Sequence, residues 1–201
     1  QEQEAEPYVF NEFPWLTTAP DVSQRMCVEA ADPDGAADKT FIDCTVEGES
    51  FTPDNVAPKD NIIVMAYNIE RGFDIDKQIE ALKNNPAVPL PDVILISESD
   101  RGCSRTSLRH ITRDYAQALE MNYVYAVEFT ELYKGEGDNH CEHGNAILAR
   151  YPLGNVEAIR HEIQTPWFED EDEPRLGGRV IINADMQVGE HIVHLYTVHL
   201  E

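Results

Sequence analysis

Lysine and arginine are scarce in this 201-residue sequence. There are 15 of them against 38 aspartates and glutamates, so the formal net charge at pH 7 is -23. Broad electrostatic binding to DNA or RNA depends on basic residues that replace the counterions of the phosphate backbone. The composition therefore argues against a general nucleic-acid-binding protein. It leaves room for a single phosphate site, because a bound divalent cation reverses the local field.

Long apolar runs and a basic, apolar leader are also missing. No stretch approaches the roughly 20 residues that a helix needs to cross a bilayer. The sequence begins at Gln1 and not at Met, so we expect any signal peptide to lie outside it. Hydrophobic residues make up 42% of the chain, which is enough for one good core at this length. We therefore predict one domain without a transmembrane segment.

The sequence has four cysteines, Cys27, Cys44, Cys103 and Cys141, and no Cys-x-x-Cys pair. The missing pair argues against a zinc ribbon. Four cysteines allow three disulfide pairings. Their even number in a processed-looking chain favours disulfides and an oxidising compartment. Four reduced thiols in the cytosol are the alternative.

Residues 1–58 show little periodicity and are predicted to form an irregular N-terminal arm. Apolar residues between Tyr8 and Leu16 could pack this arm against the domain. Cys27 and Cys44 bracket a turn at Asp32-Pro-Asp-Gly35. A bridge between these two cysteines would staple a segment that has little structure of its own. The domain proper is expected from residue 59 to residue 201.

The domain is predicted to alternate strands and helices at first and to end in strands. Residues 62–67 and 93–96 are short apolar runs typical of buried strands. Between these two runs, the apolar residues of the segment 74–85 recur at helical spacing, which predicts a helix with Asp74 as its N-cap. The order strand, helix, strand predicts parallel neighbours. A second helix is expected over residues 107–121, and further strands over residues 122–129, 146–149, 155–162, 180–188 and 191–199.

Polar side chains follow several of these predicted strands. Asn68 and Glu98 end two parallel strands, so both should lie at one edge of the sheet, where ligands bind in such folds. Asn145 with Arg150, and His199, flank two later strands. Carboxylate and amide oxygens suit a hard cation such as Mg²⁺, and an arginine grips a phosphate with two hydrogen bonds. The alternative is that these polar residues simply begin loops.

Four stretches resemble the motifs of the endonuclease/exonuclease/phosphatase superfamily, which includes deoxyribonuclease I. They are Val64-Met-Ala-Tyr-Asn68, Pro91-Asp-Val-Ile-Leu-Ile-Ser-Glu98, His143-Gly-Asn-Ala-Ile-Leu-Ala-Arg-Tyr-Pro152 and Thr197-Val-His-Leu-Glu201. Each motif is weak alone, but the four follow the family's order and cover about residues 61–201. One departure is Ser97, where the family often has glutamine. The resemblance implies a layered α/β-sandwich like that of deoxyribonuclease I, of which this chain supplies roughly the first half.

The resemblance also implies roles for five residues. Glu98 is the principal ligand of a Mg²⁺ ion, for which Mn²⁺ or Ca²⁺ could substitute, and Asn68 supports the metal or the phosphate. Arg150 contacts the phosphate of the substrate or a nearby loop. Asn145 is grouped with Arg150 as a substrate-binding residue, although it organises the site more than it touches the substrate. His199 is the catalytic residue, which hydrogen-bonds a phosphoryl oxygen. Further candidates are Asp100, Arg105 and Glu70.

The function implied is a secreted or periplasmic, Mg²⁺-dependent hydrolase of phosphoesters. The acidic composition favours small or lipid phosphoesters over duplex nucleic acid. The family also needs a second half of the same domain, with an Asp-x-Asn motif and a terminal Asp-His pair that orient or activate the attacking water. Because this sequence stops at Glu201, we expect it to be incomplete as a catalyst by itself. The alternatives are a non-catalytic structural or binding protein that retains the fold, and a secreted endonuclease.

The stretch His140-Cys-Glu-His143 carries residue types that bind zinc. Its adjacent spacing has no matching pair elsewhere in the sequence, which weakens that interpretation. We prefer a disulfide between Cys103 and Cys141, which would join the loop after the second strand to the loop before the 146–149 strand. Cys27 is then expected to pair with Cys44.

Overall fold

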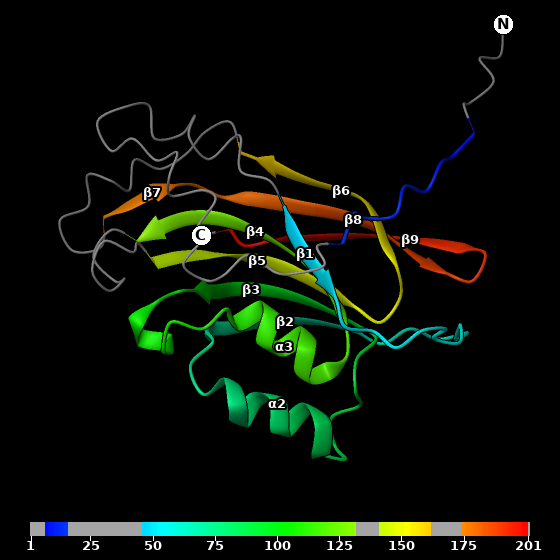
Figure 1. Ribbon diagram of the computed structural model, residues 1–201, viewed down its shortest axis with the longest axis horizontal. Helices are drawn as coiled ribbons and strands as arrows, with labels where there is room; N and C mark the ends of the chain where they lie inside the picture. The colour runs from blue at the N-terminus through cyan, green and yellow to red at the C-terminus, as the bar shows by residue number, and fades with distance from the viewer. Residues whose placement is uncertain (1–6, 16–45, 132–140, 162–173, 201) are drawn as a thin grey trace, which may run out of the picture.

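The computed structural model describes residues 7–15, 46–131, 141–161 and 174–200. Within these ranges the protein is a mixed α/β fold in which strands dominate (Figure 1). The strands are β1 (Glu47–Ser50), β2 (Val64–Arg71), β3 (Val93–Arg101), β4 (Asn122–Glu131), β5 (Cys141–Ala149), β6 (Leu153–Arg160), β7 (Arg175–Gly177), β8 (Val180–Val188) and β9 (His191–Val198). The helices are α2 (Ile75–Asn84), α3 (Ile111–Leu119) and the short 3₁₀ helix η1 (Ser104–Thr106).

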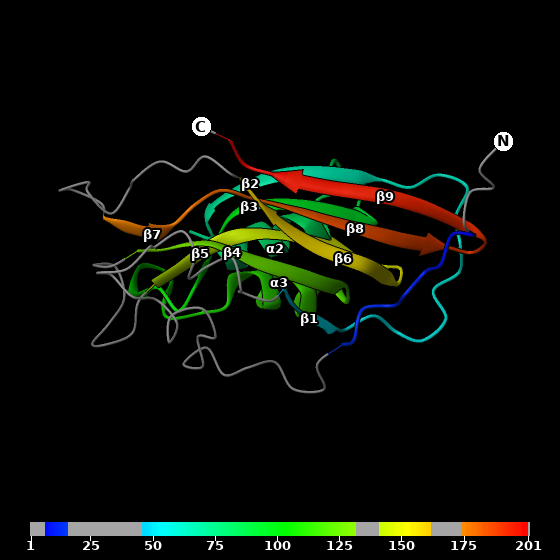
Figure 2. The ribbon, with the colours of Figure 1, turned by 90° about the horizontal axis from the view of Figure 1, so that it is seen from above.

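The strands form two sheets. The larger sheet has the order β1-β4-β5-β3-β2, and β7 pairs with β4 beside this path. The smaller sheet has the order β6-β8-β9. In Figure 1 the two α-helices lie below the larger sheet, and the smaller sheet lies above it. Figure 2 shows β9 passing over β2 and β3, so the end of β9 comes close to the end of β3.

Each face of the larger sheet is covered by a hydrophobic core. The core on the helix side joins Ile94 and Ile96 of β3 to Ile111 and Tyr115 of α3. The core between the sheets contains the residue of β3 that points the other way, Val93, together with residues of β5, β8 and β9. Neighbouring residues of a strand point to opposite faces. The face of the larger sheet to which a residue of β3 points therefore follows from its place in this alternation.

The expected strand, helix, strand unit is confirmed. β2 and β3 pair in parallel from Val64 opposite Val93 to Asn68 opposite Ser97, and α2 connects them. The predicted hairpin around Gly189 is also confirmed, because β8 and β9 pair along their whole length. Gly189 has a φ of 60°, a conformation that glycine adopts at little steric cost.

Several local expectations are wrong. Much of the predicted irregular arm lies outside the described residues, but near its end β1 is regular and pairs with β4 in the larger sheet. Asp74 precedes α2 as predicted, yet its side chain makes no capping hydrogen bond, and its carboxylate instead accepts a hydrogen bond from Nζ of Lys77 at 2.6 Å. The second helix starts later than expected, since residues 104–106 form η1 and His110 caps α3 by accepting from the backbone N–H of Arg113.

The predicted disulfide between Cys103 and Cys141 is present, with the two Cα atoms 4.6 Å apart. It links the end of β3 to the start of β5, so it fixes the edge of the sheet where the polar residues gather. Cys27 and Cys44 lie outside the described residues. None of the helices in the described ranges is long and apolar enough to cross a membrane.

A buried cluster of charges lies on the helix side of the larger sheet. Arg101 of β3 donates to Glu142 of β5 through Nε, at 2.5 Å, and to Glu47 of β1 through Nη1. The Nε2 atom of His110 also contacts Glu47, and all four residues are at most 5% exposed. A buried charge pair is stable only when both partners stay in place. The cluster therefore holds three strands and the start of α3 in one arrangement.

We expect Glu47→Gln to lower the free energy of unfolding at pH 7 by about 3 kcal/mol. Burial alone would raise the pKa of Glu47, but the charges of His110 and Arg101 outweigh it and lower the pKa to about 2. The carboxylate thus stabilises the fold above its unfolded pKa of about 4.5, and this contribution is lost as the pH falls through about 2. Urea unfolding between pH 2 and pH 7 measures both effects.

The matched control for this prediction is Glu49→Gln. Glu49 lies on the same strand and pairs with Arg113 at 2.9 Å, but Arg113 is one-third exposed. Loss of such a pair should change the free energy of unfolding by less than about 1 kcal/mol. Equal effects of the two substitutions would contradict the special role of Glu47.

Removal of the disulfide should also destabilise the protein. The bridge closes a loop with a sequence separation of 38, for which the chain-entropy model gives about 4 kcal/mol. We expect the double variant Cys103→Ser/Cys141→Ser to lose roughly that much in chemical unfolding under non-reducing conditions. A loss below about 1 kcal/mol would show that the charge cluster and the strand pairing hold this edge without the bridge.

Candidate functional site

The candidate site begins where β2 and β3 end together. Nδ2 of Asn68 donates a hydrogen bond to Oε1 of Glu98 at 2.7 Å. Oδ1 of Asn68 accepts the backbone N–H of Glu70 at 2.9 Å, which fixes the direction of the amide. The sequence correctly brings Asn68 and Glu98 to one edge of the sheet. Asn68, however, uses its nitrogen to orient the carboxylate, so in this structure it positions the predicted metal ligand.

A β-bulge in β3 determines which side chains face the site. Ile96 pairs with Ala146 and Ser99 pairs with Gly144, so β3 has one residue more than β5 over this interval. Glu98, within the bulge, has a φ of 60°, which costs about 1–2 kcal/mol for a residue other than glycine. The extra residue reverses the alternation of the strand. Asp100 consequently points between the two sheets and not toward the helices.

A second bulge lies in β4 at the same level of the sheet. Val127 pairs with Gly144 and Phe129 pairs with His143, so Glu128 is the extra residue. Val127 packs in the helix-side core, whereas Phe129 stacks on the ring of His143 between the sheets, with the centroids 4.8 Å apart. The bulge therefore turns Phe129, and Glu131 after it, toward the same space as Asp100.

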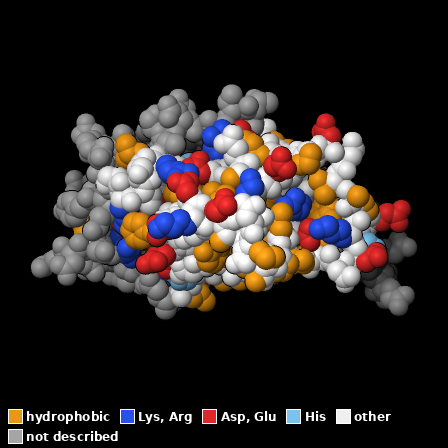
Figure 3. All heavy atoms as spheres, turned by 90° about the horizontal axis from the view of Figure 1, so that it is seen from below, with side chains coloured by type: hydrophobic (Ala, Val, Ile, Leu, Met, Phe, Trp, Pro, Cys, Tyr) orange, Lys and Arg blue, Asp and Glu red, His pale blue; other side chains and the backbone are white. Residues whose placement is uncertain are grey.

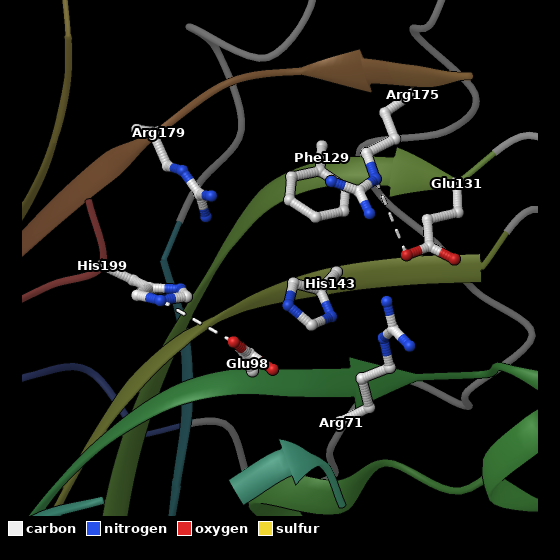
Figure 4. Close-up of a pocket in the computed structure, with 8 residues that line it drawn as sticks. All are labelled: Arg71, Glu98, Phe129, Glu131, His143, Arg175, Arg179 and His199. Atoms are coloured by element: carbon white, nitrogen blue, oxygen red, sulfur yellow. Dashed lines mark ion pairs between the residues drawn. The ribbon is translucent and has the colours of Figure 1, made fainter. Parts of the chain in front are cut away.

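These strand ends surround a small cavity of about 60 Å³. Figure 4 shows that its side chains come from both sheets, and that the three arginine head groups point toward the space between them. Bulges occur often beside active sites because they redirect side chains. The lining residues are Arg71, Glu98, Phe129, Glu131, His143, Arg175, Arg179 and His199.

His199 reaches this cavity from the end of β9, as predicted. Its Nε2 atom lies 3.7 Å from Oε1 of Glu98, so the predicted metal ligand and the predicted catalytic residue face each other (Figure 4). Its Nδ1 atom is buried, and within the part of the chain that the structure describes it has no hydrogen-bond partner. A buried polar atom of this kind is rare unless a ligand, ion or water satisfies it.

His143 is held in place from below by Asp100. Its Nδ1 atom lies 2.9 Å from Oδ1 of Asp100, and Arg105 binds both oxygens of the same carboxylate at 2.6 and 2.8 Å. Burial would raise the pKa of Asp100, but the hydrogen bonds from Arg105 and His143 outweigh burial and lower it. The carboxylate therefore stays charged and keeps the imidazole of His143 oriented toward the cavity.

Asn145 lies behind the cavity wall and does not line it. This fully buried residue donates from Nδ2 to Oε1 of Glu128 at 3.0 Å and to the backbone oxygen of Val180 at 3.3 Å. Glu128 also accepts from Nη1 of Arg179 at 3.1 Å. Burial raises the pKa of Glu128, although the charge of Arg179 partly opposes the shift. Asn145 thus organises the wall, which agrees with the expectation that it organises the site more than it touches the substrate.

Arg150 does not line the cavity, and of the two contacts that the resemblance implies, with the phosphate or with a nearby loop, the structure shows only the one with a loop. Its backbone N–H donates to the oxygen of Asp92 at 3.0 Å, and its Nε donates to the oxygen of Pro91 at 3.3 Å. Both contacts are at the start of β3, whereas Glu98 is near its end. β5 is antiparallel to β3, so the residue that follows β5 lies at the opposite edge from the cavity.

The remaining candidates, Asp100, Arg105 and Glu70, lie in two different places. Asp100 and Arg105 lie next to the cavity and support His143 and Glu131, which also accepts from Arg105 at 2.5 Å. Glu70 lies on a groove between β2 and α2, on the other side of the sheet edge. Asp100 and Arg105 thus belong to the support of the site, and Glu70 does not.

A zinc site around Cys141 does not fit the structure. Asp100, Cys103 and Cys141 form the one group of three metal-binding residue types found among the described residues, but the two cysteines share a disulfide and offer no thiolate. Glu142 and His143 also point to opposite faces of β5, toward Arg101 and toward the cavity. The carboxylate of Glu98 is the donor that fits a hard cation at the cavity.

Sequence reasoning gave no role to six of the lining residues, Arg71, Phe129, Glu131, His143, Arg175 and Arg179. Arg71 follows the predicted Asn68 closely and gave the one available signal, since the strand delivers a guanidinium as well as an amide. His143 was considered only as part of a zinc motif. Arg175 and Arg179 lie more than a hundred positions from Arg71, so no local pattern connects them.

The comparisons with known proteins do not assign the chain to a family. No protein-family model matches the chain, and no curated protein matches it.

We expect Asn68→Asp to destabilise the protein when no divalent cation is present. The substitution would place a second carboxylate within hydrogen-bonding distance of Glu98, where Nδ2 of Asn68 now lies at 2.7 Å. Because both side chains are partly exposed, repulsion should cost only about 1 kcal/mol. Chemical unfolding at pH 7 with EDTA measures this loss, and added salt should reduce it. An unchanged free energy of unfolding would mean that Asn68 does not orient Glu98.

Proposed function

We propose that this chain carries the metal-binding and phosphate-binding side of a Mg²⁺-dependent phosphoester hydrolase. The observation that carries the proposal is the pairing of Glu98 with Asn68 at a shared strand end, opposite His199. Mg²⁺ is commonly bound by one or two carboxylates, with waters and the phosphate of the substrate completing its shell. Two carboxylates line the cavity, and Glu98 is the one that would hold the cation, because Glu131 is bound to Arg105.

Each residue has a defined task in this proposal. Glu98 would hold the cation, which supplies charge stabilisation to the phosphoryl oxygens when bound. Asn68 keeps the carboxylate of Glu98 turned toward the cavity. His199 would offer its buried Nδ1 to a phosphoryl oxygen, and the Asp100–His143 pair provides an oriented second imidazole. Preorganised groups of this kind lower the barrier because they need not reorganise during the reaction.

The proposal extends to a deoxyribonuclease I-like fold and to a further half of the same domain. β2 and β9 are edge strands of the two sheets on the same side of the protein (Figure 2). Both carry exposed apolar side chains, including Val64 at 50%, Tyr196 at 61% and Val198 at 41%. Edge strands with apolar surface are natural sites for additional strands. A second half that covers both edges would also bring its own catalytic groups to the cavity.

We also propose an oxidising compartment, either extracellular or periplasmic. The Cys103–Cys141 disulfide supports this location, because such bonds persist mainly outside the cytosol. A small or lipid phosphoester remains the preferred substrate. Seen from the helix side, acidic and basic side chains are interspersed on the surface (Figure 3), and Arg109 there is paired with Asp76 and Asp114. That face therefore offers little attraction to duplex nucleic acid.

We expect Glu98→Gln to abolish Mg²⁺-dependent hydrolysis in the protein expressed from its full reading frame. The amide keeps the shape of the side chain but removes the charge that binds the cation. The fold should remain intact, and the variant should be no less stable than wild type in EDTA. Hydrolysis of a panel of phosphomonoesters and phosphodiesters, together with Mg²⁺ titration calorimetry, provides the measurement.

Glu70→Gln is the matched control for this experiment. Glu70 is only two residues from Asn68 and is exposed, but it does not line the cavity. Its substitution should leave Mg²⁺ affinity and hydrolysis unchanged. Wild-type activity in Glu98→Gln would refute the role of Glu98. An inert wild-type protein would instead favour the non-catalytic binding protein, and plasmid nicking without hydrolysis of small esters would favour the endonuclease.

A further inference from the structure

A second, larger cleft lies at the opposite edge of the larger sheet from the candidate site. Its volume is about 360 Å³, within the range of about 300–1,000 Å³ that is usual for small-molecule sites. It forms where β1 ends, where β4 begins and where the chain passes from β5 to β6. It is lined by, among others, Glu12, Trp15, Thr52, Asp54, Asn122 and Arg150.

The N-terminal arm brings an indole ring to this cleft. The backbone N–H of Phe13 donates to the oxygen of Leu153 at 2.9 Å, which ties the arm to β6. The ring of Phe13 contacts that of Trp15, with the centroids 5.1 Å apart, and Nε1 of Trp15 donates to Oε1 of Glu12 at 3.0 Å. Because the one polar atom of the indole already has a partner, Trp15 offers a ligand its flat apolar face.

A chain of hydrogen bonds fixes the polar side of the cleft. Oγ1 of Thr52 donates to Oδ1 of Asn122 at 3.2 Å, and Nδ2 of Asn122 donates to the backbone oxygen of Tyr151 at 2.9 Å. The hydroxyl of Ser50 lies 3.4 Å from that of Thr52. A hydroxyl has one donor and two acceptor positions. These groups therefore present a prearranged polar surface, which lowers the cost of ordering side chains when a ligand binds.

Charges of both signs line the cleft without pairing with each other. Arg150 is half-buried and donates from Nε to the oxygen of Pro91 at 3.3 Å. Within the part of the chain that the structure describes, its terminal nitrogens Nη1 and Nη2 have no hydrogen bond or ion pair, although Glu12 and Asp54 line the same cleft. Arginines elsewhere in the fold bind carboxylates. The cleft therefore keeps charged donors and charged acceptors for a ligand that needs both.

We propose that this cleft binds a neutral sugar ring. A pyranose has C–H bonds on one face, which pack on an aromatic ring, and hydroxyls around its rim, each of which donates and accepts hydrogen bonds. Trp15 supplies the aromatic face, Arg150 supplies donors, and Glu12 and Asp54 supply acceptors. An anionic ligand fits less well, because two carboxylates outnumber the one guanidinium. The inference does not depend on the proposed hydrolase, since the cleft and Glu98 lie at opposite ends of β3.

Saturation-transfer NMR tests the proposal with the methyl glycosides of glucose, galactose, mannose and N-acetylglucosamine. At least one of the four should bind with a millimolar Kd, and a protein that binds none of them overturns the inference. Methyl glucuronoside, whose carboxylate would meet the charges of Glu12 and Asp54, should bind more weakly than the best neutral glycoside. Equal or tighter binding of the acidic sugar overturns the preference for a neutral ring.

Substitutions in the cleft should weaken binding of the best glycoside. Trp15→Ala and Arg150→Gln should each raise its Kd at least about tenfold, because the first removes the aromatic face and the second removes charged hydrogen bonds. Trp15→Phe, which keeps an aromatic ring, should fall between wild type and Trp15→Ala. Unweakened binding in either Trp15→Ala or Arg150→Gln overturns the inference.

A further pair of variants keeps the test valid if loss of Trp15 detaches the arm. Asp54 and Asp60 are both exposed and lie six positions apart, but only Asp54 lines the cleft. Asp54→Ala should weaken sugar binding, and the matched control Asp60→Ala should bind as wild type does, with far-UV circular dichroism unchanged in both. Equal effects of the two substitutions overturn the inference.

The same measurement distinguishes two sources of the sugar. Methyl glycosides of disaccharides that end in the best-bound sugar are compared with the methyl glycoside of that sugar alone. Tighter binding of a disaccharide identifies the end of a glycan chain as the ligand, and equal binding identifies a single sugar. Both results support the site, whereas disaccharide binding that persists in Arg150→Gln overturns it.

Discussion

The pairing of β3 on both of its edges is the constraint on which the candidate site depends. β3 lies between β2, which runs parallel to it, and β5, which runs antiparallel. The first pairing brings Asn68 beside Glu98, and the second brings His143 beside Asp100. The Cys103–Cys141 bridge and the Arg101 cluster close the same end of these strands. The polar groups are thus fixed by backbone pairing, which is far less adaptable than side-chain packing.

The charges around the cavity are held in buried ion pairs. Glu128, Glu131 and Asp100 are almost fully buried, and each contacts an arginine. A buried carboxylate without a partner would be strongly destabilising, so each anion effectively requires its arginine. The buried anions therefore hold the cations at the wall of the cavity. The electrostatic potential at the cavity therefore depends mainly on these few buried ion pairs.

The sequence predicted those parts of the site whose positions depend on strand order. It did not predict those whose positions depend on strand direction or on β-bulges. Asn68 and Glu98 lie near the ends of neighbouring parallel strands and His199 follows β9, so strand order alone was enough to predict that they belong to one site. Arg150 was misplaced because the motif that contains it spans an antiparallel strand, whose two ends lie at opposite edges of the sheet. The convergence of Arg71 with residues more than a hundred positions away has no local signature. It depends on tertiary contacts between the two sheets.

The bulges in β3 and β4 have a consequence for how such a site is acquired or lost. Asp100 points between the two sheets and Phe129 lines the cavity only because one extra residue reverses the alternation of each strand. Deleting that residue would turn the following side chains toward the helices, while the hydrophobic residues before it would keep their places. Substitutions can therefore change the charge of the cavity. The wall of the cavity, however, depends on the insertion of one extra residue in β3 and one in β4. Among related chains, the length of these strands should record the presence of the site better than the identity of any one residue.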